Sequence, residues 1–256
     1  MIEAVLTGAV AGGTCLVFAG LGELTAERSG VINLGTEGSM LCGALAAYAV
    51  GIGTGSPWLG VLGGLVAGAV LAAVHAYLVL HRHANQIAVG LVVSFLGLGI
   101  TALFGQSYVG QGVVPLPTWS IPGLSSLPFF GPVLFDHDPL TYLSFLAGPV
   151  LAWMLWRTRP GLTLRSAGEG PEVLEIYGTS ARRVRWAALL AGGALAGVGG
   201  AQLSTAATLN WSEGMTVGRG YVAVALVIFA GWNPLKLSAG AYLFSGAIAL
   251  QLQLQA

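Results

Sequence analysis

The residues that could do chemistry are concentrated in four polar stretches of an otherwise apolar chain. The first polar stretch, 22–38, contains Glu23, Glu27, Arg28 and Glu37. A charged side chain at the middle of a bilayer costs roughly 2.5–3.5 kcal/mol, so these groups must lie at an interface, in a cavity or in pairs. The stretch therefore indicates an irregular segment beside a polar path, and an ordinary solvated loop is the alternative.

The second polar stretch, 81–86, leads into an apolar run. Arg82 is expected in the lipid headgroup region. Asn85 and Gln86 lie at the start of the expected helix, where two adjacent amides either cap the helix or face a solute.

The third polar stretch, 209–220, contains Glu213 and Arg219 on either side of a glycine-rich turn. An apolar run follows this turn, as one also follows the first polar stretch. The shared composition suggests an internal repeat of the kind found in transporters.

The fourth polar stretch, 165–185, contains a short predicted helix over about 171–177. Proline is favoured at the first helical position and glycine after the last, which fits Pro171 and Gly178. The helix dipole favours acidic residues in the first turns, as at Glu172 and Glu175. A short helix between two groups of arginines is suited to docking in a groove of a partner. The residues expected to form this contact are Pro171, Glu172, Glu175, Ile176 and Gly178.

The composition excludes a soluble globular enzyme. Charged residues make up 8% of the 256 residues, against roughly 25% in soluble domains, and the mean hydropathy is +0.80. The net charge of zero provides no field for nucleic acid. The single lysine, Lys236, is not in a P-loop, so this chain does not hydrolyse ATP by that route.

No metal site or disulfide is expected. The four histidines do not have the spacing of metal ligands, and Cys15 and Cys42 both lie in apolar runs, where cysteine is usually a small packing residue.

Hydropathy predicts an all-α polytopic membrane protein with about eight transmembrane or membrane-embedded helices. Residues 1–256 are expected to form one membrane domain. Repeated Gly-x-x-x-Gly pairs are expected to bring helices into close contact. The predicted spans are 4–22, 38–54, 57–80, 84–104, 138–156, 186–207, 221–235 and 237–256.

The basic residues predict the orientation. Six of the ten lie in 157–185, which the positive-inside rule places in the cytoplasm. Residues 105–137 contain five prolines and no Lys or Arg, and are expected to form a structured external loop. The amino terminus is expected outside the cell if 23–37 does not cross the bilayer.

At this point a family resemblance becomes clear. The sequence Glu-Arg-Ser-Gly-Val-Ile-Asn-Leu-Gly-Thr-Glu-Gly at 27–38 resembles a motif of ABC-importer permeases of the branched-chain amino acid and simple-sugar superfamily, above all the nucleoside-uptake branch. Residues 84–90, 214–221 and 225–234 agree with the same family. The spacing from Glu172 to Gly178 is similar to that of the permease coupling loop, although Val and Leu replace its two alanines.

The resemblance implies a permease subunit that is not an enzyme and that forms the translocation path for nucleosides in a bacterial plasma membrane. The implied partners are cytoplasmic ATPase subunits, which bind ATP and Mg²⁺, a second homologous permease in a heterodimer, and an external solute-binding protein or lipoprotein. This chain itself is expected to bind no cofactor. Family members usually continue beyond the end of this sequence, so a terminal helix is expected to be absent or otherwise supplied.

Polar residues at membrane depth persist mainly where they face a cavity or each other, which gives the expected solute contacts. Asn33, Glu37, Asn85 and Gln86 are expected to line the path, with Glu213 and Arg219 in the outer vestibule. A permease for simple sugars or branched-chain amino acids is an alternative on the same scaffold. A self-sufficient secondary transporter or channel is an alternative of another class, which the scarcity of intramembrane carboxylates disfavours.

Overall fold

The computed structural model describes residues 2–125 and 127–255, and it confirms the predicted all-α class. The helices are α1 Ile2–Arg28, α2 Thr36–Thr54, α3 Pro57–Leu80, α4 Gln86–Gly105, α5 Phe130–Leu134, α6 Pro139–Arg157, α7 Arg159–Glu169, α8 Pro171–Ile176, α9 Ala181–Gln202, α10 Arg219–Phe229 and α11 Pro234–Gln255. A 3₁₀ turn, η1 Gln106–Tyr108, extends α4, and a π-helical turn, η2 Leu203–Ala207, extends α9. The two strands, β1 Trp119–Ser120 and β2 Asp136–His137, form one antiparallel pair.

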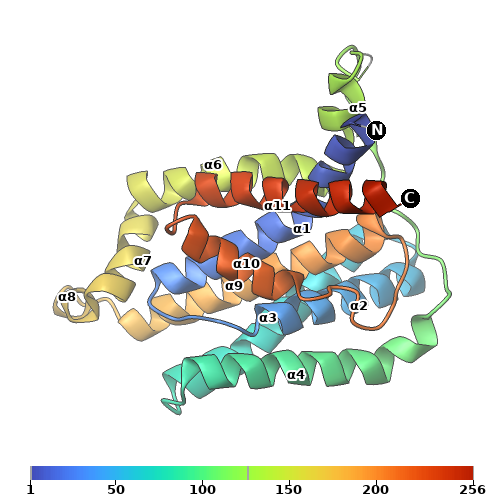
Figure 1. Cartoon of the computed structure of the whole chain (residues 1–256). Helices are drawn as coiled ribbons and strands as arrows, with labels where there is room; N and C mark the ends of the chain where they lie inside the picture. The colour runs from blue at the N-terminus through green and yellow to red at the C-terminus, as the bar shows by residue number, and fades with distance from the viewer. Residues whose placement is uncertain (1, 126, 256) are drawn as a thin grey trace.

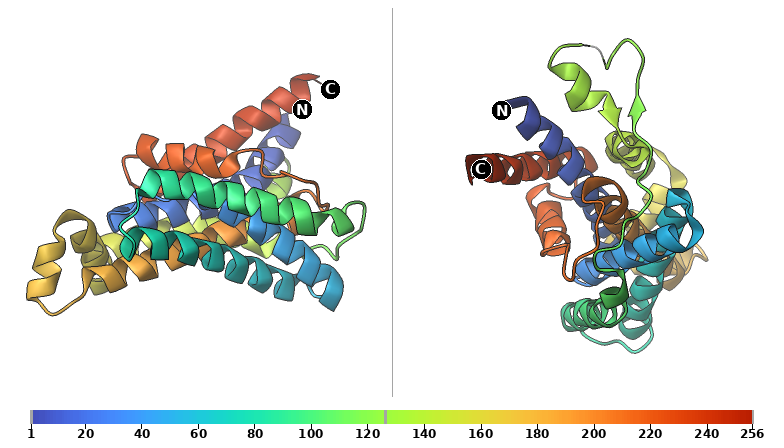
Figure 2. Two further views of the ribbon diagram at one scale, coloured as in Figure 1. Left: turned by 90° about the horizontal axis from the view of Figure 1, so that it is seen from below. Right: turned by 90° about the vertical axis from the view of Figure 1, so that its right-hand side faces the viewer.

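The long helices lie side by side in one bundle (Figure 1). One end of the bundle carries α7 and α8, and we call it the α8 end. The opposite end carries α5 and both chain termini, and we call it the α5 end (Figures 1 and 2). The segment from β1 to β2, which includes α5, projects sideways from the α5 end (Figure 1).

Six helical segments of the described chain are long and apolar enough to cross a membrane, so the predicted count of about eight was slightly too high. These spans are Ile2–Arg28, Pro57–Leu80, Gln86–Tyr108, Pro139–Arg157, Ala181–Ala207 and Pro234–Gln255.

The two remaining predicted spans correspond to α2 and α10. The helix α2 has 19 residues but starts with a polar turn and is buried over much of its length. The helix α10 has 11 residues and is therefore about 16 Å long, roughly half the thickness of the hydrocarbon core. The predicted span 221–235 extends too far, because Pro234 begins α11, in agreement with the preference of proline for the first helical turn.

Glycine contacts hold α3 against α9, as the Gly-x-x-x-Gly pattern predicts. A Cβ atom on Gly68 would lie 2.2 Å from the carbonyl oxygen of Gly193, and one on Gly197 would lie 2.2 Å from that of Gly64. The two backbones are therefore in direct contact, and no larger residue fits at these positions. Such packing replaces the hydrophobic driving force that is missing between helices in lipid.

Cationic side chains gather at the α8 end. Nine of the ten Lys and Arg residues lie there, in α7 or in helix ends and connections, and the exception is Arg219 at the start of α10. The nine are Arg28, Arg82, Arg157, Arg159, Arg165, Arg182, Arg183, Arg185 and Lys236.

Candidate functional site: a polar junction inside the bundle

Two helices of the bundle start in its interior. Figure 1 shows α10 beginning in the middle of the bundle and running toward the α8 end, whereas α2 begins in the middle and runs toward the α5 end. The first and third polar stretches lead into these two helix starts and meet there. Broken helices of this kind bring polar backbone and helix dipoles to membrane depth, which is where transporters place their solute and ion sites.

Glu37 joins the two helix starts. Its side chain is buried, and its Oε1 atom accepts hydrogen bonds from Thr216 Oγ1 at 2.6 Å and from the Gly218 amide at 2.9 Å. Its Oε2 atom accepts a bond of 2.6 Å from the Gly220 amide. A Cβ atom on Gly220 would lie 2.4 Å from Glu37 Cα, so glycine is required for this approach. A carboxylate at the start of α10 is also favoured by the dipole of that helix.

Glu23 holds the first polar stretch against α1. It is 1% exposed, and it accepts hydrogen bonds from the Asn33 amide at 2.7 Å and from Thr36 Oγ1 at 2.8 Å. The side chain of Asn33 accepts a bond of 3.0 Å from the Gly35 amide. These contacts satisfy backbone groups that have no helical partner in the turn between α1 and α2.

Asn85 and Gln86 lie at the start of α4, at the α8 end. Asn85 Oδ1 accepts bonds from the Ile87 and Ala88 amides at 3.0 and 3.1 Å, which is a helix N-cap. Gln86 Oε1 accepts a bond of 3.1 Å from the Ile32 amide and so contacts the first polar stretch. Of the two roles that the sequence left open for Asn85, the structure shows the cap, and solute contact stays a prediction.

Arg219 and Glu213 lie on different sides of the turn before α10. Arg219 Nη1 donates to the carbonyl oxygens of Met215 at 3.2 Å and Thr216 at 3.4 Å. Glu213 is exposed on the turn. Within residues 2–125 and 127–255 the one ion pair joins Arg28 to Glu169 at 3.9 Å, so Arg219 has no carboxylate partner there.

The structure therefore brings Asn33, Glu37 and Arg219 into one region, with Gln86 at its edge toward the α8 end. Sequence reasoning did not select Thr216 for this site. A lone threonine in a glycine-rich turn carries no pattern of its own, and only the contact with Glu37, which is 179 positions away, reveals its role.

The predicted docking helix is present as α8. It starts at Pro171, and Gly178 follows it with a positive φ of 75°. Leu174 is buried against Ala167 and Ala181, which attaches the helix to the bundle. At the end of α8, Ile176 and the following Tyr177 are 82% and 81% exposed. Together with the exposed Glu172 and Glu175, they form a mixed apolar and acidic surface that no part of the described chain covers.

Arg185 connects the fourth polar stretch to the first. Its Nε atom donates to the Ser29 carbonyl at 3.0 Å, and its Nη2 atom donates to the Ala167 carbonyl at 2.8 Å. The backbones also touch, because a Cβ atom on Gly168 would lie 2.5 Å from the Arg28 carbonyl oxygen. A displacement of α7 and α8 would therefore be passed directly to the turn between α1 and α2.

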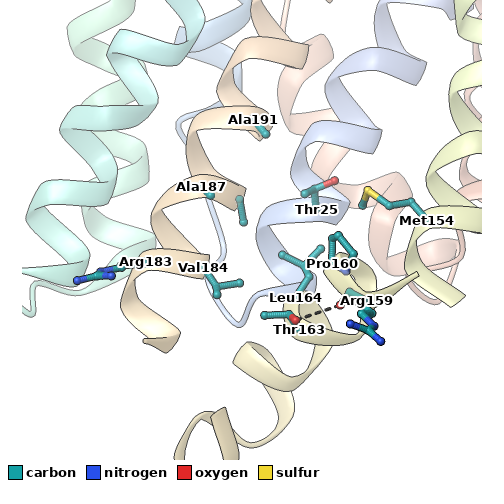
Figure 3. A pocket seen from close by; sticks show the side chains of 11 residues that line it. Thr25, Met154, Arg159, Pro160, Thr163, Leu164, Arg183, Val184, Ala187 and Ala191 are labelled. Carbon is teal, nitrogen blue, oxygen red and sulfur yellow. Dashed lines mark hydrogen bonds between the residues drawn. The ribbon is translucent and has the colours of Figure 1, made fainter. Parts of the chain in front are cut away.

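A large cavity of about 570 Å³ lies between α1, α7 and α9 at the α8 end (Figure 3). Its walls are mainly apolar and include Leu164, Val184 and Ala188, while Arg159 and Arg183 lie at its edges. Binding sites for polar solutes need a few convergent polar groups that fix orientation. This cavity lacks such a set and is not a candidate for the solute site.

The broken helices, the buried polar junction and the six spanning segments define a multi-pass membrane protein of the transporter class. The sequence model of the family described as "Branched-chain amino acid transport system / permease component" matches residues 5–255. The chain belongs to this family.

Curated relatives include permeases for two kinds of solute. A putative glucose ABC transporter permease protein of Haloferax volcanii is 43% identical over 98% of this chain and 77% of its own length. A nucleoside ABC transporter permease protein of Lactococcus lactis is 32% identical over 90% of this chain and 76% of its own length. A guanosine ABC transporter permease protein of Bacillus subtilis is 28% identical over 93% of this chain and 78% of its own length. No solved structure matches the chain.

Family membership makes the chain the non-catalytic membrane subunit of an ABC transporter, with multiple passes through the plasma membrane. ATPase and solute-binding protein partners follow from the same membership.

Proposed function

We propose that this permease forms the translocation path of an ATP-driven importer for nucleosides. Simple sugars are the second candidate. Two relatives named for nucleosides or guanosine support the first solute class, and the relative with 43% identity, named as a putative glucose permease, supports the second. The observation that carries the proposal is the continuous set of contacts from the exposed α8 to the polar junction.

The α8 end lies in the cytoplasm in this proposal. The positive-inside rule assigns the basic end to that side, and nine of ten cationic residues lie there. Residues 157–185 then form the cytoplasmic coupling loop, and 105–137, with α5 and the β pair, form the external loop of a single permease domain at 1–256.

Coupling runs through three steps in sequence. ATP and Mg²⁺ bound to the partner ATPases close those subunits and displace α8, which moves α7 through Leu174 and Ala167. Arg185 passes the movement to Ser29 and the first polar stretch. Glu37 then shifts α10 relative to α2 and changes which side of the membrane the junction faces.

The solute path lies beside the junction, with Asn33 and Gln86 toward the cytoplasm and Arg219 and Glu213 toward the outside. Both oxygens of Glu37 already accept hydrogen bonds, so they are not free to bind a coupling ion. This arrangement supports import of an uncharged solute driven by ATP, and it disfavours a self-sufficient secondary transporter. A second homologous permease in a heterodimer completes the path.

Uptake by the assembled complex in proteoliposomes tests the proposal. We expect ATP inside the vesicles, on the face that binds the ATPases, to drive accumulation of a labelled nucleoside delivered with the binding protein. Unlabelled nucleosides, simple sugars and branched-chain amino acids serve as competitors. Accumulation that needs an ion gradient but no ATP would overturn the importer, and competition by amino acids alone would overturn the solute class.

A further inference from the structure

A second cavity, which shares Arg219 with the polar junction, lies between α1, α11 and η2. Its volume is about 240 Å³. The helices α1 and α11 lie side by side toward the α5 end, where both termini are found (Figure 1). The wall on the α9 side is the π-helical turn η2, and such turns occur frequently at functional sites. The lining residues that matter here are Gly12, Leu16, Arg219, Ser245 and Ile248.

Ser245 provides a hydroxyl group in this cavity. The residue is 5% exposed, and it lines the cavity. A Cβ atom on Gly12 would lie 2.7 Å from the Oγ atom of Ser245, so glycine keeps the space beside the hydroxyl open. Ser238 on the same helix donates to the Pro234 carbonyl at 3.0 Å. A hydroxyl group in the cavity lining can donate a hydrogen bond to a ligand oxygen and accept one from a ligand hydroxyl group.

Arg219 also lines this cavity and provides further donors. A guanidinium group has five N–H donors, and the two hydrogen bonds of Arg219 both use Nη1. Gln202 adds a third polar group behind the wall. Its amide nitrogen donates at 3.2 Å to the carbonyl of Ala11, a lining residue, and its Oε1 atom is buried without a partner.

We propose that this cavity is a subsite for the sugar ring of the transported solute. The hydroxyl groups of the ring accept hydrogen bonds from Arg219, and they donate to or accept from the hydroxyl group of Ser245. Leu16 and Ile248 contact the apolar face of the ring. The inference rests on the proposed function, because nucleosides and simple sugars share such a ring.

The size and charge of the cavity favour a single uncharged ring. Pockets for complete small ligands usually measure about 300–1,000 Å³, so 240 Å³ fits one ring better than a whole nucleoside. Arg219 is the one charged residue in the lining, whereas phosphate groups are generally held by several cations or amide groups.

Thiol protection tests the subsite directly. Ser245→Cys is introduced into the assembled complex, with Cys42→Ala as background because Cys42 is the more exposed native thiol. We expect a small water-soluble maleimide to label this thiol, and adenosine, ribose or glucose to slow the labelling at least five-fold. Adenine should not protect. Ser238→Cys is the matched control, and its labelling should not respond to any of these compounds.

Protection by adenine but by none of the sugars would overturn the subsite, as would a thiol at position 245 that never reacts. Transport provides the second measurement. Ser245→Ala removes one small hydroxyl group from the cavity lining, so assembly should be intact while KM rises about three- to ten-fold, the range of one net hydrogen bond. Ser238→Ala should keep the normal KM.

The two proposals fail separately. If the unmodified complex imports neither nucleosides nor sugars, the proposed function is wrong. If it imports nucleosides and Ser245→Ala has an unchanged KM, the importer stands and the subsite is wrong.

Discussion

Glu37→Gln tests whether the polar junction is a structural connection between the starts of α2 and α10. The substitution keeps the size of the side chain and replaces one acceptor oxygen with an NH₂ donor. Three donors currently point at the carboxylate: Thr216 Oγ1 and the amides of Gly218 and Gly220. In either amide orientation, the new NH₂ group meets at least one N–H donor that then has no acceptor.

The expected cost follows from these contacts. One buried N–H group without an acceptor costs about 1–3 kcal/mol, and losing a charge at a helix start adds roughly 0.3–2 kcal/mol. The sum of about 1–5 kcal/mol should lower the Tm of the purified permease by roughly 3–20 °C.

Thermal unfolding of the purified permease measures this effect, with Glu213→Gln as the control. Glu213 is an exposed carboxylate in the same turn, so its substitution should change Tm by less than about 1–2 °C. Equal Tm values for the two variants would show that Glu37 does not hold α10, and the coupling route through the junction would then lose its last step.

Three further predictions concern other parts of the molecule. Glu172→Arg on the exposed face of α8 should leave membrane insertion and Tm intact but abolish uptake and ATPase stimulation; normal ATP-driven uptake would contradict the docking role. Asn85→Asp keeps the N-cap of α4, whereas Asn85→Leu removes a cap worth about 1 kcal/mol. A lower Tm in the leucine variant alone indicates a capping role. Altered solute affinity in both variants indicates solute contact. Gly68→Val should prevent folding because its Cβ would lie 2.2 Å from the Gly193 oxygen, while Gly99→Ala, with open space around it, should be tolerated, as expression and Tm would show.

The helical spans could be predicted from the sequence wherever apolar length and local stop signals agreed. The span 57–80 was predicted at its observed bounds, because Ser56 caps the helix, Pro57 begins it and a polar cluster follows it. The span 221–235 was wrong at its end. Hydropathy records that a run is apolar but does not show where the chain turns, and here it turns at 230–233 before Pro234.

The candidate site could be predicted only in part. Charge in an apolar background singled out Glu37 and Arg219, and the structure places both at the polar junction. The partners could not be predicted, because Gly220 meets Glu37 across 183 positions of sequence. Ser245 had no signal at all, since a single serine in an apolar helix has the same appearance whether its hydroxyl group bonds the preceding turn or opens into a cavity.

The two hydrogen bonds of Arg185 determine which substitutions the contact between α9, α7 and the end of α1 tolerates. Both acceptors are main-chain carbonyl oxygens, which every amino acid provides and which do not titrate. Substitutions at positions 29 and 167 that fit the available space should therefore keep both hydrogen bonds of Arg185, and acidification on that side of the membrane should not break them. The arginine alone is irreplaceable in this connection, because lysine cannot reach two divergent oxygens with a rigid, forked group.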